Sequence, residues 1–305
     1  MITSIFSKSK PINFIIVGIL ITLVFTAVNF QQVTNNLSTA PTIVLKFLLV
    51  IFFVFLLNFI VSKNKLTQGN SYSIMTFGLL ILMFPESTRH SNLLLSNLFV
   101  LFALRRLISL HSNLHIKKKL FDAGFWIACA TLFYFWAFLF FALVMVALIY
   151  HSQNNIKNLA VPFIGISTFV LLLVSYNILM HDVYLLPSNF ERFASLDFTP
   201  YNTKASILKL TIIFTSFLWT TLYFFNGLKD KNKKIRPSYF LVGWASFLAI
   251  FVAIIAPNKN GSEFIFLFAP FSIIMANYLE VISERWFKEI FPVLFVVVPV
   301  VSLLL

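Results

Sequence analysis

Acidic and basic side chains occur together in three polar stretches of an otherwise apolar chain. They are Glu86, Arg89 and His90 in residues 85–90, Asp182, Glu191, Arg192, Asp197 and Lys204 in residues 181–206, and Lys259 and Glu263 in residues 257–263. A positioned carboxylate can accept a proton from a hydroxyl, and cationic side chains can hold a phosphate. Together these groups are suited to a transferase that acts on a phosphate-linked substrate.

We therefore predict one site on the outer side of a membrane. The candidate catalytic residues are Glu86 and Asp182, and the candidate substrate-binding residues are Arg89, His90, Arg192 and Lys259. The competing interpretation is that these side chains form solvated ion pairs, because loops outside a membrane must be polar.

No metal or cofactor site is predicted. His111 and His115 are four residues apart and would share one face of a helix, but no carboxylate accompanies them. The single cysteine, Cys129, lies in an apolar segment, so neither a disulfide nor a cysteine-based metal site is available. The sequence motifs of soluble nucleotide-binding proteins, zinc proteases and serine hydrolases are absent.

The composition is that of a membrane protein. The 305 residues are 59% hydrophobic and only 11% charged, and the mean hydropathy is +0.91. The apolar residues fall in long blocks separated by short polar breaks, which predicts an all-α, polytopic transmembrane helical bundle. The net charge of +13 lies mostly in short loops between these blocks, so the positive-inside rule explains it better than nucleic-acid binding does.

The blocks predict about eleven membrane segments in a single domain, residues 1–305. They are residues 12–30, 42–61, 72–84, 92–110, two segments within 121–150, 161–180, 207–225, 239–256, 264–281 and 291–305.

The basic loops decide how residues 121–150 are arranged. Lys117, Lys118 and Lys119 precede this stretch, and five Lys and Arg residues gather in residues 226–238. Both clusters are expected in the cytoplasm, which requires residues 121–150 to form a hairpin with its turn near residues 134–136. The N-terminus is then inside and the C-terminus outside, and Asp122 is expected to neutralise Arg105, Arg106 or the lysine run.

Three stretches carry a resemblance to a known family: SIFSKSKPINFIIV, SNLFVLFALRRLISL and KKKLFDAGFWIACATLFYFWAFLFF. They resemble an uncharacterised family of polytopic bacterial inner-membrane proteins. The hairpin-rich layout is also similar to that of the C-type integral-membrane glycosyltransferases, which use polyprenyl-phosphate sugars at the outer face. That similarity implies an acid in the first outer loop, whereas residues 31–41 contain none.

Two functions remain open at this point. The first is a membrane glycosyltransferase-like protein in the bacterial inner membrane, which acts on a polyprenyl-phosphate-linked substrate. The alternative is a non-catalytic membrane subunit of a cell-envelope assembly, such as a secretion or motility machine. The expected partners are the lipid bilayer, a polyprenyl-phosphate lipid and other membrane proteins, without nucleic acid.

Overall fold

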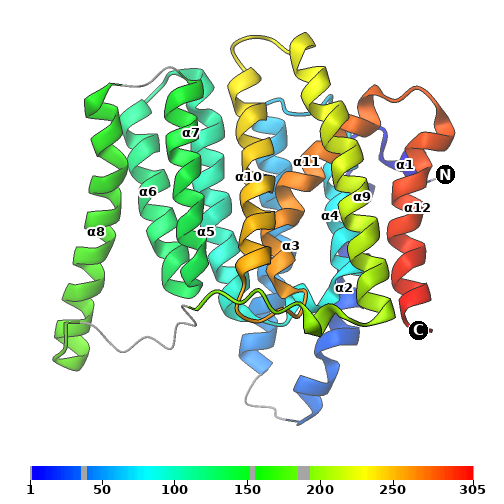
Figure 1. The fold of residues 1–305 in the computed structure, drawn as a ribbon, viewed down its shortest axis with the longest axis horizontal. Helices are drawn as coiled ribbons and strands as arrows, with labels where there is room; N and C mark the ends of the chain where they lie inside the picture. Colours follow the sequence, from blue (N-terminus) through cyan, green and yellow to red (C-terminus); the bar gives the residue numbers. More distant parts are fainter. Residues whose placement is uncertain (1, 36–39, 152–154, 185–192, 305) are drawn as a thin grey trace. The chain divides into compact units, whose positions relative to one another are not determined.

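The part of the chain that the structure describes is mostly helical. The computed structural model describes residues 2–35, 40–151, 155–184 and 193–304, which form α-helices and short 3-10 helices and contain no strand (Figure 1). The predicted all-α class is therefore confirmed. The chain divides into two compact units. Unit 1 comprises Met1–Leu94, Leu196–Lys231 and Asn258–Leu305, and unit 2 comprises Leu95–Ser195 and Asn232–Pro257.

Seven helical stretches in the described residues are long and apolar enough to cross a membrane. They are Pro11–Asn29, Ala40–Lys63, Ser91–Ser112, Ile156–His181, Lys204–Asp230, Arg236–Ile255 and Ser262–Val281. Each of them corresponds to one predicted segment, so the chain is a polytopic helical membrane protein.

The four other predicted segments differ from these seven in physical ways. Helix α4 (Tyr72–Met83) has 12 residues, about 18 Å of helix against a hydrocarbon core of about 30 Å. Residues 121–150 are broken at Tyr134. Helix α12 (Arg285–Ser302) begins six residues before the predicted segment, so most of the predicted loop 282–290 is helical and charged. Length and composition alone therefore support seven spans, not eleven.

Unit 1 is built around two helices that are apolar on all sides. Helix α11 (Ile265–Val281) is buried from Ile265 to Leu279, and nearly all of α4 is buried as well. A helix with no polar face is stable only when other helices cover it. Here α4 contacts α11 and is flanked by three other helices, and α11 also contacts α9. The remaining helices of unit 1 are α1 (Ile2–Phe6), α2 (Pro11–Asn35), α3 (Ala40–Lys63), η2 (Pro85–Thr88), η5 (Thr199–Tyr201), α9 (Lys204–Asn226), η6 (Gly227–Asp230), η7 (Ser262–Phe264) and α12.

Different contacts hold the helices together at each of the two ends of unit 1. At one end, the Glu280 carboxylate accepts the Gln68 backbone N–H at 2.6 Å. The Glu289 carboxylate accepts the Thr3 backbone N–H at 3.0 Å, which holds α1 against α12. At the other end, η2 packs against η7. Unit 1 thus separates the predicted cytoplasmic loops from the predicted outer loops.

In unit 2 the chain reverses direction after one of its helices. Helix α6 (Ile116–Phe133) ends at Tyr134, which is extended, with φ −147° and ψ 112°. The chain then turns back through η4 (Phe135–Phe141) and α7 (Ala142–Tyr150), both of which contact α6 (Figure 1). The break lies at the predicted turn, residues 134–136. The other helices of unit 2 are most of α5 (Ser91–Ile108), η3 (Ser109–Ser112), α8 (Ile156–His181) and α10 (Arg236–Ile255).

Asp122 has a cationic partner in unit 2, as the sequence predicted. Its Oδ2 atom is 2.8 Å from Nη2 of Arg106. The side chains are 18% and 33% exposed, so solvent screens the pair only in part. Of the three candidate partners, the structure identifies Arg106.

Candidate functional site

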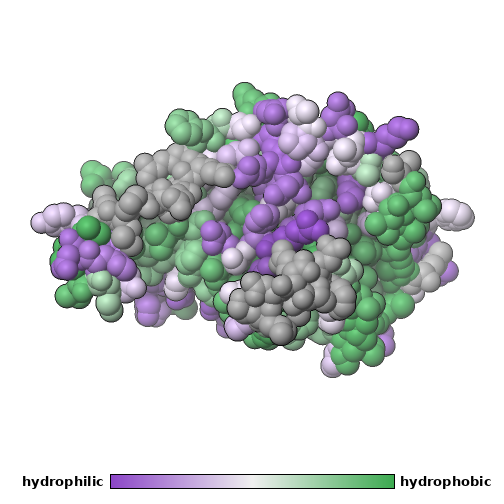
Figure 2. Space-filling view, turned by 90° about the horizontal axis from the view of Figure 1, so that it is seen from below, coloured by the Kyte–Doolittle hydropathy of each residue, from purple (hydrophilic) through white to green (hydrophobic). Residues whose placement is uncertain are grey.

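Charged and polar side chains gather at the end of unit 1 where η2 packs against η7. We call this group the polar cluster; it consists of Lys46, Glu86, Arg89, His90, Asp197, Tyr201, Lys209, Lys259, Asn260 and Glu263. Figure 2 shows the molecule from this side, with a hydrophilic band bordered by hydrophobic side chains. The cluster joins four stretches that lie far apart in sequence.

Local sequence explains why the backbone turns here. Pro85 follows α4 and begins η2. Proline lacks the N–H that would continue an α-helix, so α4 ends before it. Gly261 precedes η7 with φ +88°, a conformation that residues with a Cβ rarely adopt. A Cβ at this position would also lie 3.3 Å from the Phe84 ring.

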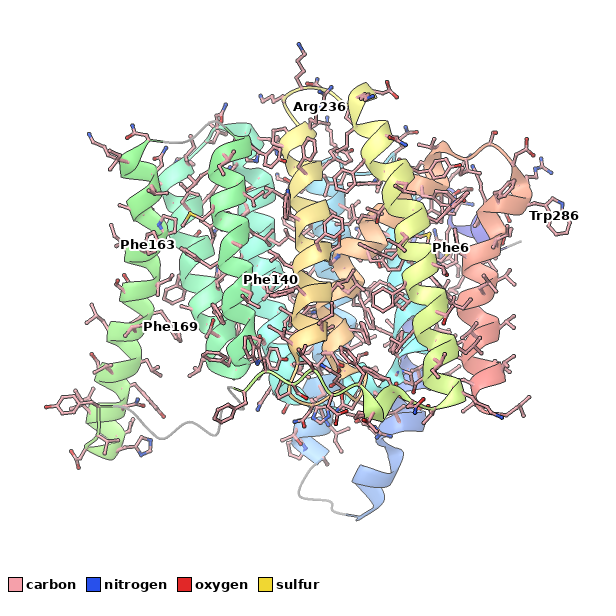
Figure 3. All side chains as sticks on the ribbon, viewed as in Figure 1. Phe6, Phe140, Phe163, Phe169, Arg236 and Trp286 are labelled. Atoms are coloured by element: carbon pink, nitrogen blue, oxygen red, sulfur yellow. The ribbon has the colours of Figure 1, made fainter. Side chains whose placement is uncertain are left out.

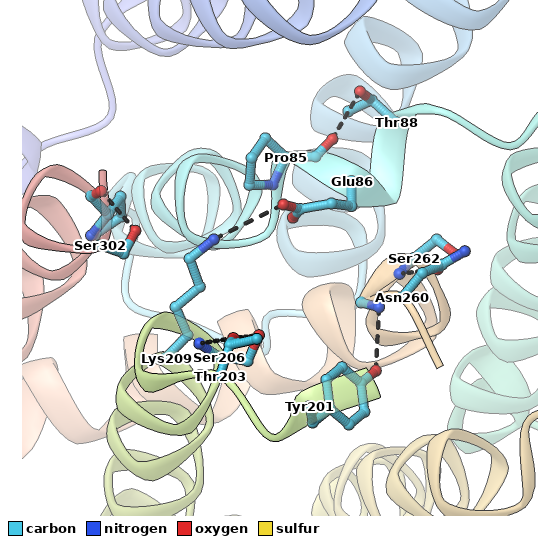
Figure 4. Close-up of polar contacts among 12 residues, drawn as sticks. Pro85, Glu86, Thr88, Tyr201, Thr203, Ser206, Lys209, Asn260, Ser262 and Ser302 are labelled. Carbon is cyan, nitrogen blue, oxygen red and sulfur yellow. Dashed lines mark hydrogen bonds and ion pairs between the residues drawn. The ribbon is translucent and has the colours of Figure 1, made fainter. Parts of the chain in front are cut away.

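Glu86 faces a lysine from another helix. Its Oε1 atom is 3.8 Å from Nζ of Lys209, which reaches across from α9 (Figure 4). The Glu86 side chain is 35% exposed and that of Lys209 is 15% exposed. The long distance and the exposure make this a loose pair, so the Glu86 carboxylate remains available to a ligand.

Glu263 is a buried carboxylate with one satisfied oxygen. Only 1% of the residue is exposed. The Tyr201 hydroxyl donates to its Oε1 atom and accepts the Gly261 backbone N–H at 3.0 Å. The Oε2 atom of Glu263 is buried without a hydrogen-bond partner, which is costly for a carboxylate. Burial and the neighbouring Glu263 raise the pKa of Tyr201, so its hydroxyl stays protonated.

Lys259, in the loop before η7, is a buried cation. It is 4% exposed, and its Nζ atom lies 4.7 Å from the centroid of the Phe198 ring, within cation–π range. Burial lowers the pKa of Lys259, and the carboxylates of Glu263 and Asp197 oppose that shift. The pKa of Asp197 is lowered because the side chain and backbone of Thr199 donate hydrogen bonds to it.

The remaining basic residues lie around η2. Lys46 of α3 is buried, and its Nζ atom donates to the Arg89 carbonyl at 3.0 Å. His90 Nε2 is 3.2 Å from Nδ2 of Asn260, which links η2 to the loop before η7. Partial burial and the charges of Lys46 and Arg89 lower the pKa of His90, which favours the neutral ring. As a neutral ring, His90 could accept the Asn260 amide hydrogen.

The structure gathers four of the six predicted site residues, Glu86, Arg89, His90 and Lys259, in the polar cluster. Asp182 instead belongs to unit 2, where it is an exposed residue in the left-handed conformation that caps α8. Arg192 lies outside the described residues. The polar cluster, which is defined within unit 1, therefore contains one of the two candidate catalytic residues, Glu86.

Six members of the polar cluster were not among the predicted site residues: Lys46, Asp197, Tyr201, Lys209, Asn260 and Glu263. Lys46 and Lys209 are single charges inside or beside apolar segments, and such residues signal a function when they face the protein interior. For Glu263, the available signal was an acid that directly precedes an apolar helix. No pattern in the sequence predicts that residues 201 and 263 are in contact.

The residues that the structure describes contain no group of three or more metal-ligating side chains. The helical spacing of His111 and His115 does not hold. Asn113 and His115 both have positive φ, so the helix is interrupted between the two histidines. Nδ1 of His111 instead lies 2.9 Å from the Ile108 carbonyl.

Fold and sequence together define a helical, polytopic membrane protein. The chain belongs to a family of unknown function, DUF6427, whose family model matches residues 1–305. No curated protein and no solved structure matches it.

Proposed function

We propose that this chain is a membrane glycosyltransferase-like enzyme that acts on a polyprenyl-phosphate-linked substrate. The observation that carries the proposal is the polar cluster, in which the accessible carboxylate of Glu86 lies among basic residues of four separate stretches of unit 1. Such an arrangement combines a proton acceptor with phosphate ligands. An ordinary solvated loop does not require a buried lysine or a buried, half-satisfied carboxylate.

The chemistry assigns each group a role. An acceptor hydroxyl gives its proton to Glu86 while its oxygen forms a new bond to the anomeric carbon of the donor sugar. The bond from that carbon to the phosphate oxygen breaks, and polyprenyl phosphate leaves with the bonding electrons. Lys209, Arg89 and Lys259 stabilise the negative charge that develops on the phosphate. The unpartnered oxygen of Glu263 is suited to accept a hydrogen bond from a sugar or acceptor hydroxyl.

The proposal includes the topology and the location. We propose eleven membrane segments in one domain, with the hairpin 121–150, the N-terminus inside and the C-terminus outside. The polar cluster then faces outward from a bacterial inner membrane. Two observations support this: the contacts of the predicted outer loops with one another, and the gathering of the predicted inner loops of unit 1 at its other end. No cofactor is proposed.

The substitution Glu86→Gln tests the role of the base. It keeps the size of the side chain and removes the proton acceptor, so transfer should slow by about 10²- to 10⁴-fold with little effect on folding. The measurement is incorporation of radiolabelled sugar into periplasmic glycoconjugates, in a deletion strain that carries each variant at matched membrane levels. Glu284→Gln is the matched control, because Glu284 is exposed at the other end of unit 1.

Substitution of Lys209 separates binding from chemistry. Lys209→Gln should raise the apparent KM for the lipid-linked donor more than it lowers kcat, because Lys209 holds the phosphate in both the ground state and the transition state. If Glu86→Gln and Lys209→Gln support wild-type incorporation in a strain whose deletion is defective, the cluster is not catalytic. The chain is then better explained as a subunit of an envelope assembly.

A further inference from the structure

Helices α6 and α8 of unit 2 cross at two glycines that allow very close contact. A Cβ on Gly124 would lie 2.2 Å from the Pro162 carbonyl oxygen, and a Cβ on Gly165 would lie 2.4 Å from the Phe121 carbonyl oxygen. Small residues of this kind let membrane helices pack backbone to backbone. Figure 1 shows that the two helices run in the same direction.

Beyond this crossing the helices diverge and leave an apolar groove. Figure 1 shows α8 leaning away from α6 toward its C-terminal end. The groove has a volume of about 420 Å³ and is lined by α6, η4 and α8. Figure 3 shows Phe163 and Phe169 along α8, and their rings lie 5.2 Å from the Phe141 ring and 5.7 Å from the Phe125 ring. Aromatic side chains thus form both walls.

The lining leaves no place for water or for a polar ligand. Thr131 has the only hydroxyl in it, and this group donates to the Ile127 carbonyl of its own helix at 2.9 Å. A buried water needs two to four polar partners, which the groove does not provide. In a membrane protein, hydrocarbon is the medium that fills such a space.

The volume of the groove is that of one hydrocarbon chain. A cavity of about 150 Å³ holds one benzene ring, so 420 Å³ has room for nearly three times as many carbon atoms. That number matches one fatty acyl chain.

We propose that the groove between α6 and α8 binds one acyl chain of a bilayer phospholipid as a stable ligand. Phospholipids are the commonest source of hydrocarbon chains in a bilayer, so mass action favours them over scarce isoprenoid lipids. The acyl chain completes the packing that the diverging helices cannot make with each other, and it thereby stabilises the hairpin against α8. The proposal concerns unit 2 and is independent of the function proposed for the polar cluster.

The test is photolabelling of the full chain in nanodiscs. The probe is phosphatidylethanolamine that carries a diazirine on one acyl chain, and mass spectrometry locates the labelled residues. We expect labels to concentrate in residues 127–141 and 163–173. The variant Ala128→Phe fills the groove from α6 and should reduce this labelling about tenfold. Leu172→Phe is the control, because Leu172 is 58% exposed on α8 and does not line the groove.

Stability provides a second readout. Removal of phospholipid should lower the unfolding temperature of the wild type but should have less effect on Ala128→Phe, in which the ring replaces the chain. Thr131→Leu, a smaller filling variant, serves the same purpose if Ala128→Phe does not fold. Labels spread in proportion to exposure over all lipid-facing helices, or equal labelling in Ala128→Phe and Leu172→Phe, would overturn the proposal. Displacement of the probe by an equal mole fraction of decaprenyl phosphate would instead identify an isoprenoid ligand, which also contradicts it.

Discussion

Replacement of Gly165 by alanine should destabilise unit 2, although alanine is the better helix former. The added Cβ would lie 2.4 Å from the Phe121 carbonyl oxygen and 3.0 Å from the Phe125 backbone nitrogen. Both atoms belong to the backbone of α6, so no side chain can rotate away. Helix α8 must therefore move as a whole, by about 1 Å, to restore an ordinary contact.

The magnitude follows from this movement. A gap of about 1 Å forfeits up to half of the attraction between the atoms it separates, and overpacking of this kind costs about 1–3 kcal/mol. Alanine recovers up to about 1 kcal/mol through its helix propensity. The net loss should be about 1–2 kcal/mol, or roughly 2–6 °C in unfolding temperature for a chain of this size.

The assay is thermal unfolding in detergent, followed by tryptophan fluorescence. Gly18→Ala is the matched control, because Gly18 also lies in a long apolar helix and a Cβ there would have no neighbour within 4 Å. We expect Gly18→Ala to raise the unfolding temperature slightly and Gly165→Ala to lower it. Equal gains in the two variants would refute the close crossing of α6 and α8.

Two further predictions concern charges of unit 2. Asp122→Asn should lower the unfolding temperature, and a double-mutant cycle with Arg106→Gln should show a coupling free energy of about 0.5–3 kcal/mol. Purely additive losses of stability in the double variant would contradict a stabilising ion pair. Burial lowers the pKa of His151 to about 4, with the charges of His111 and Lys119 adding to the shift. The unfolded chain, with a histidine pKa near 6.5, then takes up a proton that the folded chain does not. Stability should therefore fall as pH drops from about 6.5 to 4, and His151→Gln should flatten this range of the pH profile; an unchanged profile would contradict the assignment.

Hydropathy predicted the class and the long helices, because seven apolar blocks exceed the thickness of a bilayer. Hydropathy could not predict whether a shorter apolar helix contacts lipid or protein. Helix α4 is as apolar as a lipid-facing helix, but it is covered by protein on all sides. Apolar residues are favourable in both environments, so composition cannot distinguish them. Composition also misplaced the start of α12. Its charged residues were assigned to a loop, but charge does not by itself end a helix.

The polar cluster was predictable in part, from neighbours in one loop and from Lys259 in a loop predicted on the same side of the membrane. Glu86, Arg89 and His90 are neighbours in sequence, and their common location followed from that. The contact between Tyr201 and Glu263 depends on how α9 and α11 pack, which no spacing in one sequence encodes. The loop 181–206 was treated as a single group of charges, but Asp182 caps a helix of unit 2 whereas Asp197 belongs to unit 1.

The central claim is that the polar cluster of unit 1 binds a polyprenyl phosphate. The most direct measurement is a pair of cryo-electron microscopy maps of the protein in nanodiscs, without and with saturating decaprenyl phosphate. We expect new density for a phosphate within hydrogen-bond distance of Lys209, Arg89 or Lys259, next to the carboxylate of Glu86. A phosphate bound elsewhere, or a polar cluster that is identical in the two maps, would contradict it.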